Sequence, residues 1–273
     1  MARGVAKDGL LVKSRKIFWG LGLFLALAVF LVEWIYPKTA VPVLMYHQVT
    51  EGEAANKLEV SKKTFAMQMV YLKNQGFRVI APDELVRMVQ SGQRPDNEVV
   101  LTFDDGYQDN CAQAAAILES FGLRGTFFIV TDWIGKSGWM TWEQVLDLQR
   151  RGHTIGAHSV THRFLTAMSL AEAKDEIYNS KKLLEEKLGR PVQFFCYPAG
   201  RFSTAVENLV RQAGYKGAFT NAPGWAFSNR DVFALKRIRI SDNYNDPLRF
   251  GWRLTGYFLF FRERGARRMT GWG

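Results

Sequence analysis

Two adjacent carboxylates, Asp104 and Asp105, lie between an apolar run and a glycine in the stretch LTFDDGYQDN. Successive side chains of a strand point to opposite faces, so both carboxylates can converge only where the strand becomes a loop. Gly106 permits the sharp turn that such a loop needs. Two like charges held close together are costly unless a cation lies between them. The pair therefore predicts a metal site whose other ligands come from elsewhere in the chain.

Histidines are the candidates for those ligands. His158 and His162 are separated by three residues in HSVTH, and His47 ends the apolar run of LMYHQV. Three of the four histidines thus follow predicted strands, as the aspartate pair does. Two imidazoles and one carboxylate form a catalytic metal site that keeps one coordination position open for water. His153 has no companion motif, and we expect it to be structural.

The elements that must position these residues alternate between strands and helices. Parallel strands separated by helices form a barrel or an open sheet, and chemistry collects at the carboxyl ends of the strands. We expect an α/β fold, a distorted (β/α) barrel of about seven parallel strands. The predicted strands are 41–49, 77–80, 98–103, 124–130, 153–159, 191–198, 215–220 and 233–240. The predicted helices are 61–76, 82–92, 141–152, 169–189 and 204–214, with another of about fourteen residues ending near Phe121. Their predicted caps include Ser61, Thr141, Ser169 and Thr204.

An apolar run of 20 residues at 17–36, IFWGLGLFLALAVFLVEWIY, differs from the rest of the chain. It is long enough to cross a bilayer as a helix. No small-residue cleavage site follows it, so we expect one uncleaved N-terminal transmembrane helix, with a cleaved signal or a buried helix as alternatives. Five bases in residues 1–16 predict a cytoplasmic tail, by the positive-inside rule. The main domain, residues 38–245, would then lie outside the cytoplasm on a single-pass protein of the cytoplasmic membrane.

The formal net charge of +10 is concentrated at the two ends of the chain. Residues 1–16 carry five bases and one acid, and residues 262–273 carry four bases and one acid. This distribution favours anionic lipid over nucleic acid as a partner. The aromatic and basic C-terminal segment, 246–273, either lies at the membrane interface or packs as a helix on the barrel, and both readings stay open.

Two cysteines, Cys111 and Cys196, are too few for a disulfide framework. Each has apolar neighbours in the sequence. We expect buried free thiols, with an opportunistic bridge between them as the alternative.

The stretches TFDDG at 102–106 and HSVTH at 158–162, in this order, resemble those of the polysaccharide deacetylases, the NodB-homology proteins of carbohydrate esterase family four. The resemblance covers roughly residues 41–240. It implies that Asp105, His158 and His162 hold a divalent metal, usually Zn²⁺, with Co²⁺, Ni²⁺ or Mn²⁺ as alternatives. It also implies that Asp104 is the catalytic base.

The N-terminal strand VLMYHQV resembles the branch of this family that acts on poly-N-acetylglucosamine. In that branch the acid histidine comes from the start of the domain, which implies this role for His47. No histidine follows His162, in agreement with this assignment. Nearby carboxylates would favour the charged form of the His47 imidazole.

The stretch FCYPAG at 195–200 departs from the family pattern, because Cys196 replaces an arginine and Ala199 a tyrosine. The tyrosine acts in the family through its backbone N–H, which supports the oxyanion, and Ala199 keeps that group. The missing arginine orients the base, and Arg237 in ALKRIRI resembles a family arginine that could replace it. Candidate substrate contacts are Tyr197, Trp133 and Trp139, whereas Trp142 is expected to pack in its helix.

The resemblance implies an N-deacetylase that hydrolyses acetamide groups of N-acetylhexosamine units in a cell-surface or exported polysaccharide. An O-acetyl esterase, or a deacylase of a lipid-linked sugar, would use the same fold. A non-catalytic barrel that binds glycan is a further alternative. The intact set of metal ligands argues against it, since a decaying site would be expected to lose ligands first.

Overall fold

The computed structural model describes residues 23–25, 27, 41–93, 95–221 and 231–254. Of the predicted anchor at 17–36, only residues 23–25 and 27 are among them, and they are helical. The predicted tail, 1–16, and the last part of the C-terminal segment, 255–273, lie outside the described residues. Within the described part of the chain, no helix combines the length and the apolar character needed to cross a membrane.

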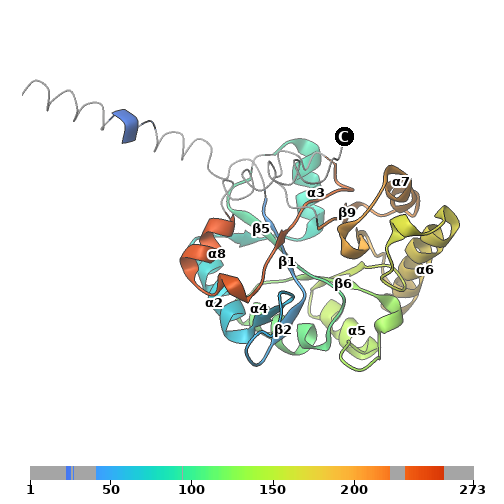
Figure 1. The fold of residues 1–273 in the computed structure, drawn as a ribbon, viewed down its shortest axis with the longest axis horizontal. Coiled ribbons are helices and arrows are strands. Elements are labelled where there is room, and N and C mark those ends of the chain that lie inside the picture. Colours follow the sequence, from blue (N-terminus) through green and yellow to red (C-terminus); the bar gives the residue numbers. More distant parts are fainter. Residues whose placement is uncertain (1–22, 26, 28–40, 94, 222–230, 255–273) are drawn as a thin grey trace, which may run out of the picture.

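The centre of the fold is one sheet of eight parallel strands (Figure 1). Its strands are β1 (Val43–Tyr46), β4 (Arg78–Val79), β5 (Glu98–Phe103), β6 (Thr126–Ile129), β7 (Thr154–Ala157), β8 (Phe194–Cys196), β9 (Gly217–Phe219) and β10 (Ile238–Arg239). The order is β10-β1-β5-β6-β7-β8-β9, and β4 pairs with the start of β5. A separate parallel pair joins β2 (Gln48–Thr50) to β3 (Glu59–Ser61). The predicted parallel α/β architecture is confirmed.

Helices surround the sheet on its outer side (Figure 1). They are α2 (Lys62–Asn74), α3 (Pro82–Ser91), α4 (Ala116–Ser120), α5 (Trp142–Arg150), α6 (Leu170–Leu188), α7 (Thr204–Gln212) and α8 (Pro247–Leu254). The chain also forms a π-helix, η1 (Asn110–Ala115), and four short 3₁₀ turns, η2 (Thr131–Trp133), η3 (Leu165–Ala167), η4 (Pro198–Gly200) and η5 (Asp242–Tyr244), among the described residues. The helix predicted after β5 is formed by η1 and α4, and η1 is a π-helix, which a 3.6-residue periodicity does not predict.

Side-chain caps start several of these helices. Three of the predicted caps are present: Ser61, Thr141 and Ser169. The cap predicted at Thr204 is wrong, because Ser203 accepts the N–H of Val206 and Thr204 is already helical. Two adjacent hydroxyl residues offered two possible starts, and the extended backbone of Ser203 decides between them.

The segment 232–239 brings the two ends of the sheet together. In its first half, the Leu235 N–H donates to the carbonyl oxygen of Ala218 in β9, at 2.9 Å, and the Thr220 N–H donates to the Leu235 carbonyl. Its end forms β10, which pairs with β1. The strand predicted at 233–240 is therefore a strand only at its end, and the rest crosses from β9 to β1. This arrangement fits a distorted (β/α) barrel.

Aromatic rings lock the register of three neighbouring strands. Tyr46 of β1 stacks on Phe103 of β5, with ring centroids 5.3 Å apart, and Phe103 stacks on Phe127 of β6 at 4.8 Å. Phe65 of α2 packs edge-on against Tyr46, at 5.1 Å. All four rings are completely buried. Since side chains alternate along a strand, the residues on either side of this row face into the barrel.

Register then places the first candidate residues side by side. Tyr46 pairs with Phe103, so the next residues, His47 and Asp104, follow at matching heights on adjacent strands. The Asp104 N–H donates to the Tyr46 carbonyl at 3.0 Å, which extends the pairing past the end of β5. The strand that His47 follows, β1, thus lies directly beside β5, which the aspartate pair follows.

Candidate active site

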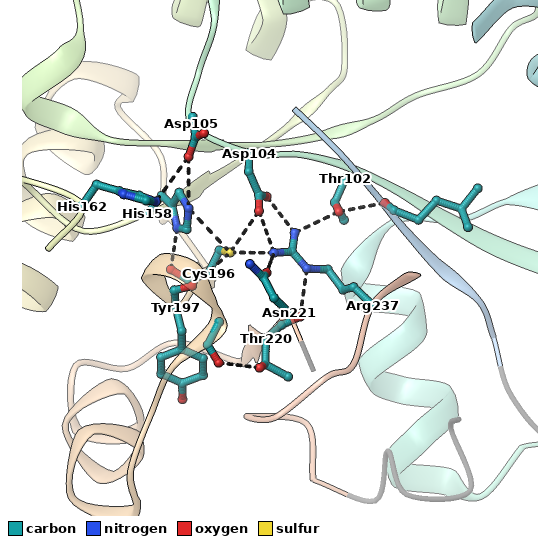
Figure 2. A network of polar contacts seen from close by, with 12 residues as sticks. Thr102, Asp104, Asp105, His158, His162, Cys196, Tyr197, Thr220, Asn221 and Arg237 are labelled. Atoms are coloured by element: carbon teal, nitrogen blue, oxygen red, sulfur yellow. Dashed lines mark hydrogen bonds and ion pairs between the residues drawn. The ribbon is translucent and has the colours of Figure 1, made fainter. Parts of the chain in front are cut away.

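The candidate residues converge at the carboxyl ends of β5, β7 and β8 (Figure 2). Asp104 and Asp105 follow β5, and Asp105 adopts a left-handed backbone conformation with φ of 72°. This conformation is unfavourable for a residue with a side chain, and it ends the alternation of the strand. Both carboxylates can therefore contribute to one site, although adjacent side chains of a regular strand would point to opposite faces.

Asp105 meets both imidazoles of the HSVTH stretch. The Nε2 atoms of His158 and His162 each lie 3.4 Å from the Asp105 Oδ1 atom. The three ligand atoms lie within 4.8 Å of one another. The Nδ1 atom of His158 is 2.7 Å from the carbonyl oxygen of Cys196 and donates to it, so Nε2 is left as the acceptor that faces Asp105. Two imidazole nitrogens and a carboxylate oxygen suit Zn²⁺ and related divalent cations.

Arg237 holds the second carboxylate. Its Nη1 and Nη2 atoms donate to the two oxygens of Asp104, both at 2.7 Å, in a bidentate pair. Both side chains are at most 1% exposed. Burial alone raises the pKa of Asp104, but the charge and hydrogen bonds of Arg237 outweigh it, and the pKa lies well below the usual range of a carboxyl group. Asp104 is therefore ionised in the folded protein.

Sequence reasoning missed the residues that orient Arg237. The guanidinium also donates to the Thr102 hydroxyl (3.1 Å), the Thr220 carbonyl (3.1 Å) and the Asn221 side-chain oxygen (2.6 Å). Thr102 lies two residues before Asp104, on the same face of β5, and strand periodicity could have identified it. Thr220 and Asn221 follow β9, and their role depends on a crossing that the sequence does not indicate.

Cys196 lies between Asp104 and His158. Its Sγ atom is 3.7 Å from Asp104 Oδ2 and 4.0 Å from His158 Nε2, so these three residues also group together. However, Arg237 Nη2 lies 3.0 Å from the same sulfur. A cation there would face the guanidinium, so we assign the metal to Asp105 and the two histidines. Cys196 and Cys111 are both buried and free, as predicted.

His47 lies at the end of β1, beside the aspartates. It is 7% exposed, and its Nδ1 atom has no hydrogen-bond partner among the described residues. The side-chain Nδ2 of Asn110, at the start of η1, donates to the His47 carbonyl at 2.6 Å. Burial lowers the pKa of His47, and the charges of Asp104 and Asp105 oppose this shift without overcoming it. The expected influence of the carboxylates is present, but desolvation is larger.

Ala199 follows β8 in the turn η4, with a left-handed φ of 51°. Gly200 has no side chain to obstruct its neighbour, since a Cβ atom there would lie 2.2 Å from the Asn221 nitrogen. The Thr220 hydroxyl also donates to the Gly200 carbonyl at 2.7 Å. The turn that carries the Ala199 N–H is thus tied to the same residues that orient Arg237.

Of the three aromatic residues predicted to contact substrate, two lie near the candidate metal ligands and one points away from them. Tyr197 is completely buried, and its hydroxyl donates to the Phe233 carbonyl at 3.0 Å, so its side chain points away from the metal ligands (Figure 2). By contrast, the half-buried ring of Trp133 lies 5.1 Å from the His162 ring and 5.1 Å from Trp139. We therefore keep Trp133 and Trp139, and not Tyr197, as candidate substrate contacts.

Tyr107, which sequence reasoning missed, connects this aromatic pair to the metal ligands. Its ring stacks on Trp139 with centroids 5.9 Å apart. Burial, the charge of Asp105 and a hydrogen bond to that carboxylate raise the pKa of Tyr107 to about 12. Its place directly after Gly106, on the loop that carries Asp104 and Asp105, is the signal that could have identified it.

Two further residues have the structural roles expected of them. His153 Nδ1 accepts the Gly125 N–H at 3.0 Å, and Nε2 lies 2.8 Å from a Glu119 oxygen. Trp142 packs against the core in α5.

Comparisons with known proteins agree with this geometry. The family model described as polysaccharide deacetylase matches residues 91–218. YxkH of Bacillus subtilis (strain 168) is 32% identical to this chain over 201 residues, 73% of this chain and 71% of that protein. Its name assigns it provisionally as a polysaccharide deacetylase. The chain therefore belongs to the polysaccharide deacetylase family, carbohydrate esterase family four, whose members are hydrolases.

Its relatives include the poly-β-1,6-N-acetyl-D-glucosamine N-deacetylase of Staphylococcus epidermidis, 21% identical over 245 residues, 80% of this chain and 84% of that protein. Among solved structures, the deacetylase PplD of Streptococcus pyogenes in complex with acetate superposes with a TM-score of 0.73 and 26% identity. The match covers 79% of this chain and 98% of that one.

Proposed function

We propose that the chain is a metal-dependent N-deacetylase that hydrolyses acetamide groups of N-acetylhexosamine units in a cell-surface or exported polysaccharide. One observation carries the proposal: Asp104, ionised by its pairing with Arg237, lies beside the cluster of Asp105, His158 and His162. A base next to a set of metal ligands is one arrangement that catalyses hydrolysis of an amide.

The cation would be held by Asp105, His158 and His162. Zn²⁺ is the expected ion, with Co²⁺, Ni²⁺ or Mn²⁺ as alternatives. When bound, such an ion supplies Lewis acidity and lowers the pKa of water.

The remaining steps belong to side chains and backbone of this chain. Asp104 accepts a proton from the water that attacks the acetamide carbon. The Ala199 N–H donates to the oxyanion that develops on the acetamide oxygen. His47 gives a proton to the amine as the carbon–nitrogen bond breaks, which releases acetate and a free amino sugar. Trp133 and Trp139 would present aromatic faces to the sugar.

The alternatives on this fold differ in substrate, and acetate release separates them. An N-deacetylase releases acetate from N-acetylglucosamine oligomers, whereas an O-acetyl esterase releases it from acetylated xylan. A deacylase of lipid-linked sugars would act on neither of these soluble substrates but on a glycolipid. A glycan-binding barrel without activity would release no acetate from any of the three. Acetate from acetylated xylan alone would contradict the proposal.

Metal removal should abolish activity. We expect a chelator to inactivate the protein and Zn²⁺ or Co²⁺ to restore it, and we expect His158→Ala to bind well under one metal per chain. His153→Gln is the matched control, because His153 lies before the same strand, β7, and bonds only structural groups among the described residues. Metal content by atomic absorption and acetate release check both. Full activity of metal-free protein would refute the metal assignment.

We propose further that residues 17–36 anchor the protein in the cytoplasmic membrane with its N-terminus inside, so that residues 38–245 lie outside the cytoplasm. The length of the apolar run and the five bases before it support this topology. A reporter enzyme fused after Gly273 is expected to be active only outside the cytoplasm. Activity confined to the cytoplasm would contradict the orientation.

The first part of the C-terminal segment packs on the barrel. Phe250 of α8 lies edge-on to Tyr71 of α2, with ring centroids 5.5 Å apart. We propose membrane contact only for the later part of the segment, 255–273, where the aromatic run 257–261 is followed by the arginine-rich run 262–268.

A further inference from the structure

The loop between the two histidine ligands has an unfavourable backbone. Ser159 and His162 both adopt left-handed conformations, with φ of 64° and 63°. Residues with a Cβ atom rarely take this conformation unless their surroundings impose it. His162 carries one of the two imidazoles and Ser159 directly follows the other, so whatever imposes this backbone also acts on the geometry of the proposed metal ligands.

Glu176 of α6 holds the middle of this loop. Its Oε2 atom accepts the backbone N–H groups of Val160 and Thr161, both at 2.8 Å, and its Oε1 atom accepts the Thr161 hydroxyl at 2.5 Å. Hydrogen bonds to a carboxylate are stronger than neutral ones and satisfy backbone groups that have no strand to pair with.

The opposite side of the loop is held by the turn after β6. The Thr131 N–H donates to the Ser159 carbonyl at 3.3 Å, and the Asp132 N–H donates to the Val160 carbonyl at 3.0 Å. The loop therefore lies between η2 and α6, with its N–H groups toward Glu176 and its carbonyls toward η2.

Glu176 itself is buried, with 8% of its surface exposed. Placing a carboxylate in such a position costs desolvation free energy that an apolar residue on the same helix face would not. The three hydrogen bonds given above for the Glu176 carboxylate all go to the 158–162 loop. This concentration on one loop separates Glu176 from residues that serve only the packing of α6.

We propose that Glu176 is a positioning residue that sets the affinity and geometry of the metal site through the 158–162 loop, without contacting the metal or the substrate. The inference rests on the proposed metal-dependent function. Residues that orient metal ligands from behind typically change metal affinity by 10- to 100-fold when removed.

The test measures metal binding by the purified full-length chain. We expect Glu176→Ala to weaken Zn²⁺ binding by about 10- to 100-fold in a competition titration, and to alter the visible absorption spectrum of bound Co²⁺. Glu176→Gln is expected to weaken it less, since the amide oxygen still accepts N–H bonds but carries no charge. At saturating metal, acetate release by Glu176→Gln should return close to the wild-type rate.

Ile177→Val is the matched control. Ile177 is the next residue of α6 and is completely buried, and the substitution removes one methyl group from the core. We expect it to lower thermal stability without changing Zn²⁺ affinity or the Co²⁺ spectrum. If Glu176→Ala does not fold, the same measurements on Glu176→Gln decide the question.

Three outcomes would overturn the inference. Folded Glu176 variants with wild-type Zn²⁺ affinity and Co²⁺ spectrum would overturn this inference and leave the proposed function in place. A loss of Zn²⁺ affinity in Ile177→Val equal to that in Glu176→Ala would do the same. A wild-type chain that binds no divalent metal would overturn the proposed function and this inference together.

Discussion

Asp104→Asn is expected to lose on the order of 10²–10⁴ in kcat and to keep its metal. An amide cannot accept the proton that the carboxylate takes from water, whereas the three metal ligands are untouched. Activity should be measured with metal content in the same preparation. Asp147→Asn, a surface carboxylate of α5, is the control and should retain full activity. Near-normal turnover of Asp104→Asn would remove Asp104 from the mechanism.

The same substitution should reveal how much the Asp104–Arg237 pair contributes to the free energy of unfolding. Removing one partner of a buried ion pair typically costs ~3–5 kcal/mol, because the other charge stays buried without compensation. The folded pKa of Asp104 is depressed, so the pair stabilises the protein above the pKa of the unfolded carboxyl group, ~3.9. This contribution is lost as the pH falls through the folded pKa. Unfolding measured at pH 7 and at acidic pH should therefore show a difference between wild type and Asp104→Asn that shrinks with acidity.

His47→Ala is expected to keep the fold and the metal but to lose on the order of 10²–10⁴ in kcat, the usual contribution of a positioned acid. His47 directly follows β1, at the height of Asp104 beside it, and in the proposed mechanism a proton donor at this position serves the leaving amine. Its absence leaves the amine to depart without a proton from the protein.

The pH–rate profile distinguishes this role from a structural one. Burial holds the pKa of His47 below its ordinary value of ~6.5, so the alkaline limb of wild type should lie to the acid side of that of an exposed histidine. That limb should change in His47→Ala, whereas His153→Gln should leave it in place. A variant with near-normal turnover and an unchanged alkaline limb would show that His47 is not the acid.

Local patterns predicted much of this fold. The strand at 98–103 is found with the predicted bounds, because an apolar β-branched run ends abruptly at charged residues. Ser169 and Glu172 form the predicted capping box, because that signal lies within four residues of sequence. The predicted strand at 41–49 divides instead into β1 and β2, with His47 unpaired between them.

Long-range arrangements were harder to predict. The pairing of Arg237 with Asp104 was expected only from the family resemblance, because it depends on which strands are neighbours and no local pattern encodes that order. Glu176 looks like any acid of an amphipathic helix until α6 is placed behind the ligand loop. Tyr197 is in a family stretch, yet its ring lies on the side away from Cys196 and the candidate ligands, where its hydroxyl bonds the Phe233 carbonyl.

The crossing segment 232–239 has a consequence for how the protein is made. The candidate metal ligands follow β5 and β7, which leave the ribosome before Arg237, and Arg237 must then dock between β9 and β1. A nascent or truncated chain that lacks this segment would hold the candidate ligands but not the guanidinium that pairs with Asp104. The Asp104 carboxylate would thus be fixed in its final orientation only after almost all of the described chain has been synthesised.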